Sequence, residues 1–523
     1  MRIRRFNVTG LCTPEKDYMV DISSKLQYIK EKIDRGEYFT IDRARQYGKT
    51  TTLQALKVYL KEIYIVVKIS FEGLGESFFS SEAQFCLGFH EIFGRGLKFS
   101  AAMEEDIEDW RCHREDMDTF LRLSDKITDF CSGREVVLLI DEVDKATNNQ
   151  TFLHFLGMLR KKYLSQKAGE DCTFLSVILA GVYDVKNMKL RMEAQGYASG
   201  REENRYNSPW NIAAAFDLDM AFSVPEIGSM LYQYEKDCHT GMDVEQVAGE
   251  IRHYTEGYPF LVSRICQEID TKGMSWDKTG VQSAVKAILM EKNTLFDDIA
   301  HNLENNQELN AFMYELLLLG KEKQYERTNS VVDLAATYGF IRNVQGKAVV
   351  DNLMFGLKMT NYFISHHAEE RRGVKITGVL AEDVVQDGHF RMDYVLEKFA
   401  EHFEGVYANV KNRKFMEDNG RLVFLTYLKP LVNGRGFYHI ESRTNSERRM
   451  DVVVDYGAEQ FILELKKWYG AKKHEDAWEQ LYQYLVEMGA EQGYLLTFDF
   501  RKEAQPEQKW VVYKGKRIFD VIV

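Results

Sequence analysis

The sequence of 523 residues has little proline and no long hydrophobic run. Its 6 prolines stand among 45% hydrophobic and 13% aromatic residues, which excludes a disordered or low-complexity chain and favours a compact, helix-rich globular protein. No stretch of about 18 consecutive apolar residues occurs, so we expect no membrane-spanning helix and no membrane partner. The length exceeds that of one ordinary hydrophobic core, and about three domains are expected.

Cysteine is scarce and scattered. The 7 cysteines stand far apart and form no Cys-x-x-Cys pair, which excludes a disulfide framework and a zinc ribbon. The basic N-terminal residues are followed by no apolar segment of the kind that a signal peptide requires. We therefore expect buried thiols and a cytoplasmic protein.

An excess of basic charge is also absent. The chain carries 68 Lys+Arg against 80 Asp+Glu, a net charge of −12, which excludes a surface coated in basic residues for nucleic acid. Residues 371–523 hold 24 basic and 24 acidic side chains, so the whole deficit lies before residue 371. A local nucleic-acid site in the neutral part stays compatible with this composition.

Short apolar runs alternate with longer helical patterns in the first part of the chain. Continuous β-branched runs are typical of strands buried on both faces, and helices between such strands indicate a parallel α/β sheet. The expected strands are 38–41, 63–69, 136–140 and 174–180.

Beyond residue 222 the pattern becomes helical, with helices expected near 225–231 and 244–254. A later hairpin, expected at 339–350 after further helices, indicates a winged-helix segment, and the polar residues 366–373 are the expected linker. Further along, we expect helices at 376–403, 413–429 and 474–488 and strands at 450–455, 461–465 and 493–498. The predicted fold class is α/β, with divisions at 1–222, 223–290, 291–368 and 374–523.

Gly48-Lys49-Thr50 follows the first expected strand and begins a helix with apolar periodicity. In this context backbone N–H groups at the helix N-terminus bind phosphate oxygens, Lys49 reaches the β- and γ-phosphates, and the Thr50 hydroxyl ligates Mg²⁺. The full G-x-x-x-x-G-K-T pattern is not met, because Arg43 stands where the first glycine belongs. The residues expected to bind a nucleotide are Arg45, Gln46, Tyr47, Gly48, Lys49, Thr50 and Thr51.

The strand expected at 136–140 runs directly into Asp141 and Glu142. An acidic pair at this position resembles a Walker B element, in which Asp141 binds the Mg²⁺ shell and Glu142 orients the attacking water. The competing interpretation is that both acids cap the next helix and that Lys49 is solvated. The order of the two motifs, each after its own strand, favours the nucleotide site.

Later segments fit the same site. Gly181-Val-Tyr-Asp184 ends the fourth strand, where a strand tip senses the γ-phosphate. Pro259 lies in a Gly-x-Pro turn that resembles the lid of signal-transduction and archaeal-type ATPases, and this resemblance places it against the nucleotide base. An ordinary helix-stop turn is the alternative. Candidate phosphate sensors, each also compatible with a solvated surface residue, are Arg191, Arg201 and Arg205.

A second constellation stands near the C-terminus, where Asp451 and the pair Glu464 and Lys466 form a D-x12-E-x-K pattern on two adjacent expected strands. A hairpin brings the two carboxylates together, so they can share one Mg²⁺ or Mn²⁺. Because side chains alternate along a strand, Glu464 and Lys466 point to the same face, and Lys466 can position or deprotonate a water beside the metal. A surface hairpin with a Glu/Lys pair is the alternative.

Helices on both sides of this hairpin carry further candidates. The D-x12-E-x-K arrangement resembles the PD-(D/E)xK nuclease superfamily, and this resemblance implies that Glu417, on the expected upstream helix, completes the site, with Glu441 as a second choice. Downstream, the same resemblance implies that the expected helix containing Gln480 supplies a Gln or Tyr side chain to the site. Basic residues cluster nearby, as contact with a phosphate backbone requires; they are Lys466, Lys467, Lys472 and Lys473.

Together these residues resemble a bacterial family that joins an AAA-like ATPase domain to a C-terminal domain of the PD-(D/E)xK nuclease superfamily. The segments that carry the resemblance are 38–52, 139–142, 180–184, 206–211, 257–262, 424–430, 448–454 and 463–466. The Arg-rich loop is shared with that family, so Arg43 is an expected variant. The resemblance implies ATP, Mg²⁺ and a nucleic-acid partner, with DNA favoured over RNA.

These inferences predict an ATP-binding and ATP-hydrolysing protein whose nucleotide state regulates a metal-dependent nuclease domain. In that domain Asp451, Glu464, Lys466, Glu417 and Gln480 are the expected catalytic set, and Glu142 is the catalytic residue of the ATPase. The alternative is a nucleotide switch that binds a protein or nucleic-acid partner through a nuclease-like domain without cleaving it. A homo-oligomer is compatible with both.

Overall fold

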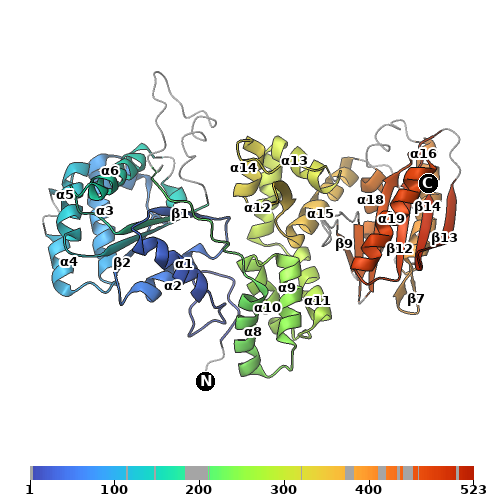
Figure 1. Ribbon diagram of the computed structural model, residues 1–523, viewed down its shortest axis with the longest axis horizontal. Helices are drawn as coiled ribbons and strands as arrows, with labels where there is room; N and C mark the ends of the chain where they lie inside the picture. Colours follow the sequence, from blue (N-terminus) through green and yellow to red (C-terminus); the bar gives the residue numbers. More distant parts are fainter. Residues whose placement is uncertain are drawn as a thin grey trace, which may run out of the picture. The chain divides into compact units, whose positions relative to one another are not determined.

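The computed structural model divides into two compact units, which are described separately below (Figure 1). The first unit comprises Met1–His239 and Gly257–Arg264, and the second comprises Thr240–Glu256 and Ile265–Val523. The structure describes residues 4–112, 116–146, 149–182, 210, 212–319, 321–370, 382–409, 420–432, 436–439, 452–457, 459–501 and 506–523.

The first unit contains a four-stranded parallel sheet in the order β1-β4-β3-β2. Every residue of the central strands β3 and β4 is buried, which explains why both are apolar except at Asp141 and Ser176. The predicted parallel α/β sheet is therefore confirmed, with strand ends displaced by up to two residues from those expected. The strands are β1 (Phe39–Asp42), β2 (Ile65–Ser70), β3 (Val136–Asp141) and β4 (Ser176–Gly181).

Helices cover both faces of this sheet (Figure 1). Alternate residues of β3 face opposite layers, with Leu139 in the core beside α1 and α2 and Leu138 in the core on the other side. This arrangement places the start of α2 at the carboxyl end of β1. The helices are α1 (Ser23–Asp34), α2 (Lys49–Leu60), α3 (Glu82–Leu97), α4 (Glu104–Arg111), α5 (Phe120–Cys131) and α6 (Gln150–Lys167), with short 3-10 turns η1 (Glu76–Phe79) and η3 (Val143–Lys145).

The helical region expected after residue 222 is present. α8 (Val224–Cys238) begins with a capping box, in which the Ser223 side chain accepts from the Glu226 N–H and the Glu226 carboxylate accepts from the Ser223 N–H. The helices that follow are α9 (Val244–Thr255), α10 (Pro259–Lys272) and α11 (Lys278–Met290). Among the described residues, no helix combines the length and the apolar character that crossing a membrane requires.

The second unit continues with further helices and the expected hairpin, whose turn residues Gln345 and Gly346 have φ of 51° and 82°. One expectation here is wrong: residues 366–370 were assigned to a linker but belong to α15. No glycine or proline occurs between Gly356 and Gly373, so nothing in the sequence stops the helix earlier. The elements are α12 (Thr294–Asn305), α13 (Gln307–Leu317), α14 (Ser330–Thr337), β5 (Ile341–Val344), β6 (Lys347–Val350) and α15 (Leu353–Glu370).

A six-stranded mixed sheet, in the order β13-β14-β12-β11-β10-β9, forms the C-terminal part. β11, β12 and β14 are parallel, and the outer pairs are antiparallel. α19 packs on one face through Leu481 and Leu485, and α16 and α18 meet Phe498 on the other. The bounds are β9 (Gly436–His439), β10 (Val452–Tyr456), β11 (Glu459–Lys467), β12 (Gln492–Phe498), β13 (Glu507–Tyr513), β14 (Lys516–Ile522), α16 (Met392–Asn409), α18 (Gly420–Val432) and α19 (Ala471–Glu487).

A second expectation is wrong near the start of this part. The helix predicted over 376–403 begins only at Met392, after a small hairpin of β7 (Val385–Gln386) and β8 (His389–Phe390). The turn residues Asp387 and Gly388 have φ of 52° and 84°, the left-handed conformation that an Asp-Gly hairpin turn requires. A second hairpin of this kind, with Lys514-Gly515 between β13 and β14, had not been expected.

Candidate functional site

The loop between β1 and α2 surrounds the Lys49 ammonium group. Its Nζ donates hydrogen bonds to the backbone carbonyls of Arg43 and Ala44, each at 2.9 Å. Gly48 has φ 75°, the left-handed conformation that turns the chain into α2. Burial lowers the pKa of Lys49, against the opposing effect of the carboxylates of Asp144, Glu142 and Asp141. The loop therefore holds a buried cation at a helix N-terminus.

Arg43, which replaces the first glycine of the usual loop, directs its guanidinium to residues outside the loop. Its guanidinium donates to the carbonyl oxygen of Leu218 at 2.7 Å and to that of Asp42 at 2.8 Å, and it lies over the Phe216 ring. Because these partners hold the side chain outside the loop, Arg43 does not fill the space around Lys49. The departure from the glycine pattern is thus accommodated by local packing.

The acidic pair lies at the carboxyl end of β3. Asp141 is 2% exposed, and one of its carboxylate oxygens accepts from the Glu142 N–H at 3.1 Å. The other oxygen lies 3.6 Å from the Nζ of Lys68, which also donates to the Thr50 carbonyl at 3.3 Å. Lys68 thus joins the two residues predicted to hold Mg²⁺, and no sequence pattern had indicated it.

Glu142 occupies a left-handed conformation with φ 54°. Burial raises the pKa of its carboxyl group, and the nearby Lys49 ammonium opposes this effect. The next acid, Asp144, accepts from the Val182 N–H at 2.6 Å and so links the ends of β3 and β4. Of the expected strand-tip sensor Gly181–Asp184, the last two residues lie outside the described residues, as do Arg191, Arg201 and Arg205.

The turn that contains Pro259 lies against the phosphate-binding loop. A Cβ atom placed on Gly48 would be 3.8 Å from the Pro259 Cβ, and the Tyr258 hydroxyl donates to the Arg45 carbonyl. The Tyr47 and Tyr258 rings meet edge to face, with centroids 4.8 Å apart. This packing places Pro259 against the loop that contains Gly48.

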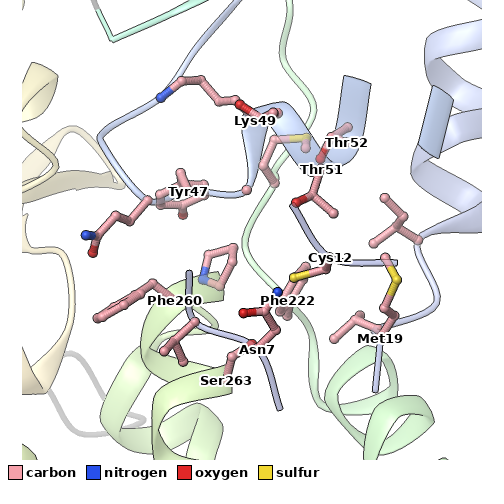
Figure 2. Close-up of a pocket in the computed structure, with 18 of the residues that line it drawn as sticks. Asn7, Cys12, Met19, Tyr47, Lys49, Thr51, Thr52, Phe222, Phe260 and Ser263 are labelled. Atoms are coloured by element: carbon pink, nitrogen blue, oxygen red, sulfur yellow. The ribbon is translucent and has the colours of Figure 1, made fainter. Parts of the chain in front are cut away.

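A cavity of about 250 Å³ opens between the loop and this turn (Figure 2). Figure 2 shows Thr51 on the loop side and Phe222 and Phe260 on the opposite side, with Cys12 between them. The N-terminal residues in this wall were missed from the sequence, because they belong to no motif. Lining residues from that segment include Asn7, Val8, Gly10, Cys12, Tyr18 and Met19.

The residues around this cavity fit a nucleoside triphosphate. Backbone N–H groups at the start of α2 and the buried ammonium of Lys49 suit phosphate oxygens. Aromatic and apolar side chains on the opposite wall, among them Phe222 and Met230, suit a planar base. Thr50 and Asp141 offer the oxygen donors that Mg²⁺ prefers.

The second candidate site lies on β11. Glu464 is fully buried and forms an ion pair with Lys466, with a distance of 2.5 Å between the Lys466 Nζ and a carboxylate oxygen. Both side chains share the face that packs against α19, as the alternation along the strand requires. Val452, the residue after Asp451, pairs with Leu463, the residue before Glu464.

The other residues predicted for this site are only partly described. Gln480 donates to the Tyr484 hydroxyl at 2.6 Å and lines a cavity of about 230 Å³ together with Lys466. Asp451, Glu417 and Glu441 lie outside the described residues. Within the described ranges, no group of three or more His, Cys, Asp or Glu side chains could hold a metal ion.

A buried polar cluster beside Gln480 had no sequence signal. His474 lies 2.7 Å from an Asp520 carboxylate oxygen through Nε2 and 3.3 Å from the Thr497 hydroxyl through Nδ1. Trp478 donates to the same Asp520 oxygen at 3.0 Å. These contacts link α19 to β12 and β14, a long-range arrangement that no local pattern reveals.

Comparison with known proteins identifies a family to which the first part of the chain is similar. Residues 16–355 match the family described as an AAA-like domain. A Walker-type ATPase of Pyrococcus abyssi is 12% identical, with 68% of this chain and 99% of that chain covered at a TM-score of 0.45. The ORC2 protein of Aeropyrum pernix is 11% identical, with 69% and 98% covered at a TM-score of 0.34. A RuvB protein of Thermotoga maritima is 13% identical, with 64% and 93% covered at 0.30.

No curated protein matches the chain. The AAA-like match covers more than half of the sequence and includes both Lys49 and the pair Asp141 and Glu142. The parallel sheet, the loop around Lys49 and the acidic end of β3 have the arrangement of a P-loop ATPase. The chain belongs to the AAA-like family of P-loop ATPases.

Proposed function

We propose that this protein binds and hydrolyses ATP and that its nucleotide state regulates a metal-dependent nuclease domain acting on DNA or RNA. The observation that carries the nuclease part is the ion pair of the buried Glu464 with the partly exposed Lys466 on one face of β11, at a cavity that Lys466 and Gln480 line. We further propose the division into an ATPase core (1–222), a helical lid (223–290), a winged-helix-like segment (291–368) and a PD-(D/E)xK domain (374–523).

In the ATPase, residues Arg45 to Thr51 would hold the phosphates, and Thr50 and Asp141 would hold Mg²⁺, which neutralises phosphate charge when bound. Glu142 would orient a water molecule, since its carboxylate lies at the end of β3 beside the buried Lys49. Pro259 would contact the base, as its approach to Gly48 supports.

In the nuclease domain, Glu464 and Asp451 would hold Mg²⁺ or Mn²⁺, which polarises the phosphodiester and acidifies a bound water. The buried carboxylate of Glu464 has the hard oxygen atoms that such an ion prefers. The register that pairs Val452 with Leu463 is the one in which a D-x12-E pattern would bring its two acids together. Lys466 would position the water, with Glu417 and Gln480 completing the site.

A cleavage assay with the purified full chain tests this proposal. The substrates are plasmid, linear duplex, single-stranded DNA and RNA, each with Mg²⁺ or Mn²⁺ and with or without ATP. We expect cleavage by the wild type, a rate that changes with ATP, and loss of cleavage in Lys466→Ala and Asp451→Ala. Lys49→Ala should abolish nucleotide binding and the effect of ATP while leaving the metal site intact.

Two outcomes would overturn separate parts of the proposal. Equal cleavage by the wild type and by both nuclease-site variants would show that the activity comes from a contaminant. Unchanged nucleotide binding and hydrolysis in Lys49→Ala would show that the loop around Lys49 is not the ATP site. Thermal unfolding of each variant excludes a trivial loss of the fold.

One observation favours a second function, a nucleotide switch with a non-cleaving docking domain. The Lys466 ammonium forms an ion pair with a carboxylate oxygen of Glu464, and the Glu464 side chain is fully buried. A metal ion must therefore compete with this ion pair. Calorimetric titration with Mg²⁺ and Mn²⁺ separates the two functions, because a docking domain would give no heat that depends on Asp451 and Glu464.

A further inference from the structure

Two cavities open at the carboxyl ends of β11 and β12, one on each face of the C-terminal sheet. The larger, of about 590 Å³, lies on the side of α18, and the smaller, of about 230 Å³, lies on the side of α19. Lys466 and Lys467 line both cavities. Ligands of parallel sheets bind characteristically at this end of the strands.

The residues that line the two cavities include more cations than carboxylates, although residues 371–523 as a whole are neutral. The cations that line the two cavities are Lys321, Arg421, Lys466, Lys467 and Lys473, and Asp476 is the carboxylate among the lining residues. Two of these cations form ion pairs, Lys466 with Glu464 and Lys321 with Glu315, so the excess of positive charge in the lining is modest. Phosphate groups are the natural counterpart of such a surface.

Aromatic rings alternate with these cations. Tyr469 follows the end of β11 and is 66% exposed, with the Lys473 ammonium 5.0 Å from its ring centroid. Trp468 lies under the Arg501 guanidinium at 4.9 Å, and Phe500 lies under Lys467 at 5.4 Å. Flat rings beside cations suit the faces of nucleic-acid bases with their phosphates alongside.

We propose that this surface, formed by Lys466, Lys467, Trp468, Tyr469, Lys473 and Phe500, binds single-stranded nucleic acid. The lysines contact the phosphates, and an unstacked base lies on the exposed Tyr469 ring. A duplex cannot use this ring, because its bases are stacked on one another and present only their edges. This inference rests on the proposed nuclease function. It extends that function by naming a single strand as the substrate.

Fluorescence anisotropy with the full chain tests the proposal in EDTA, where cleavage is suppressed. The probes are labelled DNA and RNA single strands of about 20 nucleotides and a DNA duplex of equal length. We expect single strands to bind about ten-fold more tightly than the duplex, and Tyr469→Ala to weaken single-strand binding about ten-fold with less than a two-fold effect on the duplex. Lys473→Ala should weaken binding of all probes.

Tyr482→Ala is the matched control. Tyr482 is half-buried on α19 with the Lys514 ammonium 5.2 Å from its ring, yet it lines neither cavity, so its removal should leave binding unchanged. The proposal is overturned if the duplex binds as tightly as the single strands, or if Tyr469→Ala and Tyr482→Ala behave alike. If binding depends on Tyr469 but the cleavage assay with metal shows no cleavage, the single-strand inference is supported and the nuclease activity is rejected. The inference and the proposed function can therefore fail separately. The DNA and RNA arms identify the favoured strand.

Discussion

Among single residues of the nucleotide site, Lys68 balances the negative charge of Asp141. Its carboxylate is buried beside Lys68, whereas the Lys49 ammonium is bound to loop carbonyls. A buried carboxylate without a partner is strongly disfavoured. In the nucleotide-free protein, Lys68 therefore supplies the positive charge that Mg²⁺ would bring.

The change Lys68→Met tests this role. Without metal, the uncompensated Asp141 carboxylate would repel the nucleotide phosphates, and we expect affinity for ATP in EDTA to fall about ten-fold. In saturating Mg²⁺ the expected loss is less than about two-fold, because the ion replaces the lost charge. Calorimetry or a fluorescent nucleotide measures both affinities.

Lys57→Met provides the control for this change. Lys57 is a half-buried lysine of the adjacent helix α2 that interacts electrostatically with Lys68. The change Lys57→Met should leave the ratio of the ATP affinity in EDTA to the ATP affinity in Mg²⁺ unchanged. If Lys68→Met weakened ATP binding equally with and without Mg²⁺, Lys68 would not have the assigned role of compensating the charge of Asp141.

At the scale of elements, a single turn positions the start of α10 against the phosphate-binding loop. The Phe222 N–H donates to the Gly257 carbonyl at 2.8 Å, and Gly257 has φ 73°. A Cβ atom on Gly257 would lie 2.1 Å from the Phe222 oxygen. No residue other than glycine satisfies both constraints, and the orientation of Tyr258 and Pro259 depends on them.

Gly257→Ala should therefore destabilise the protein by about 2–4 kcal/mol and weaken nucleotide binding. Gly249→Ala is the opposite case, because Gly249 lies inside α9 with nothing within 4 Å of an added Cβ atom. That change should raise stability by up to about 1 kcal/mol. Thermal unfolding followed by circular dichroism measures both, and similar effects of the two changes would refute the argument.

The elements also show where local patterns succeed and fail. The strand that ends in Asp141 could be predicted because a strand buried on both faces is a nearly continuous apolar run. The helix expected over 376–403 was wrong at its start, because the Asp387-Gly388 turn outweighed the helical pattern around it. The same kind of turn, at Lys514-Gly515, joins the two last strands of the sheet.

At the scale of the whole molecule, charge is distributed unevenly. The net charge of −12 belongs to the residues before 371, whereas four cations of the neutral part, Arg421, Lys466, Lys467 and Lys473, line the two cavities of the C-terminal sheet. Average charge therefore says little about where nucleic acid could bind, since electrostatic contact is local at physiological ionic strength.

This distribution predicts a modest salt dependence. With the three lysines of the proposed surface, Lys466, Lys467 and Lys473, and about 0.7 ions released per contact, a plot of log affinity for a single strand against log salt concentration should have a slope of about −2. Anisotropy titrations between about 50 and 200 mM salt measure it. A slope near zero would exclude phosphate contacts at these residues, and a much steeper slope would point to a larger basic surface elsewhere.

The amino-acid sequence alone determined the parallel sheet, the loop around Lys49 and the acidic end of β3, because these depend on short patterns within one strand and its following turn. It also indicated that Glu464 and Lys466 share a face, since side chains alternate along a strand. Only the tertiary structure placed Lys68 beside Asp141, the N-terminal residues in the wall of the nucleotide cavity, and His474 beside Asp520. Such contacts join residues far apart in the chain, and packing of whole elements decides them.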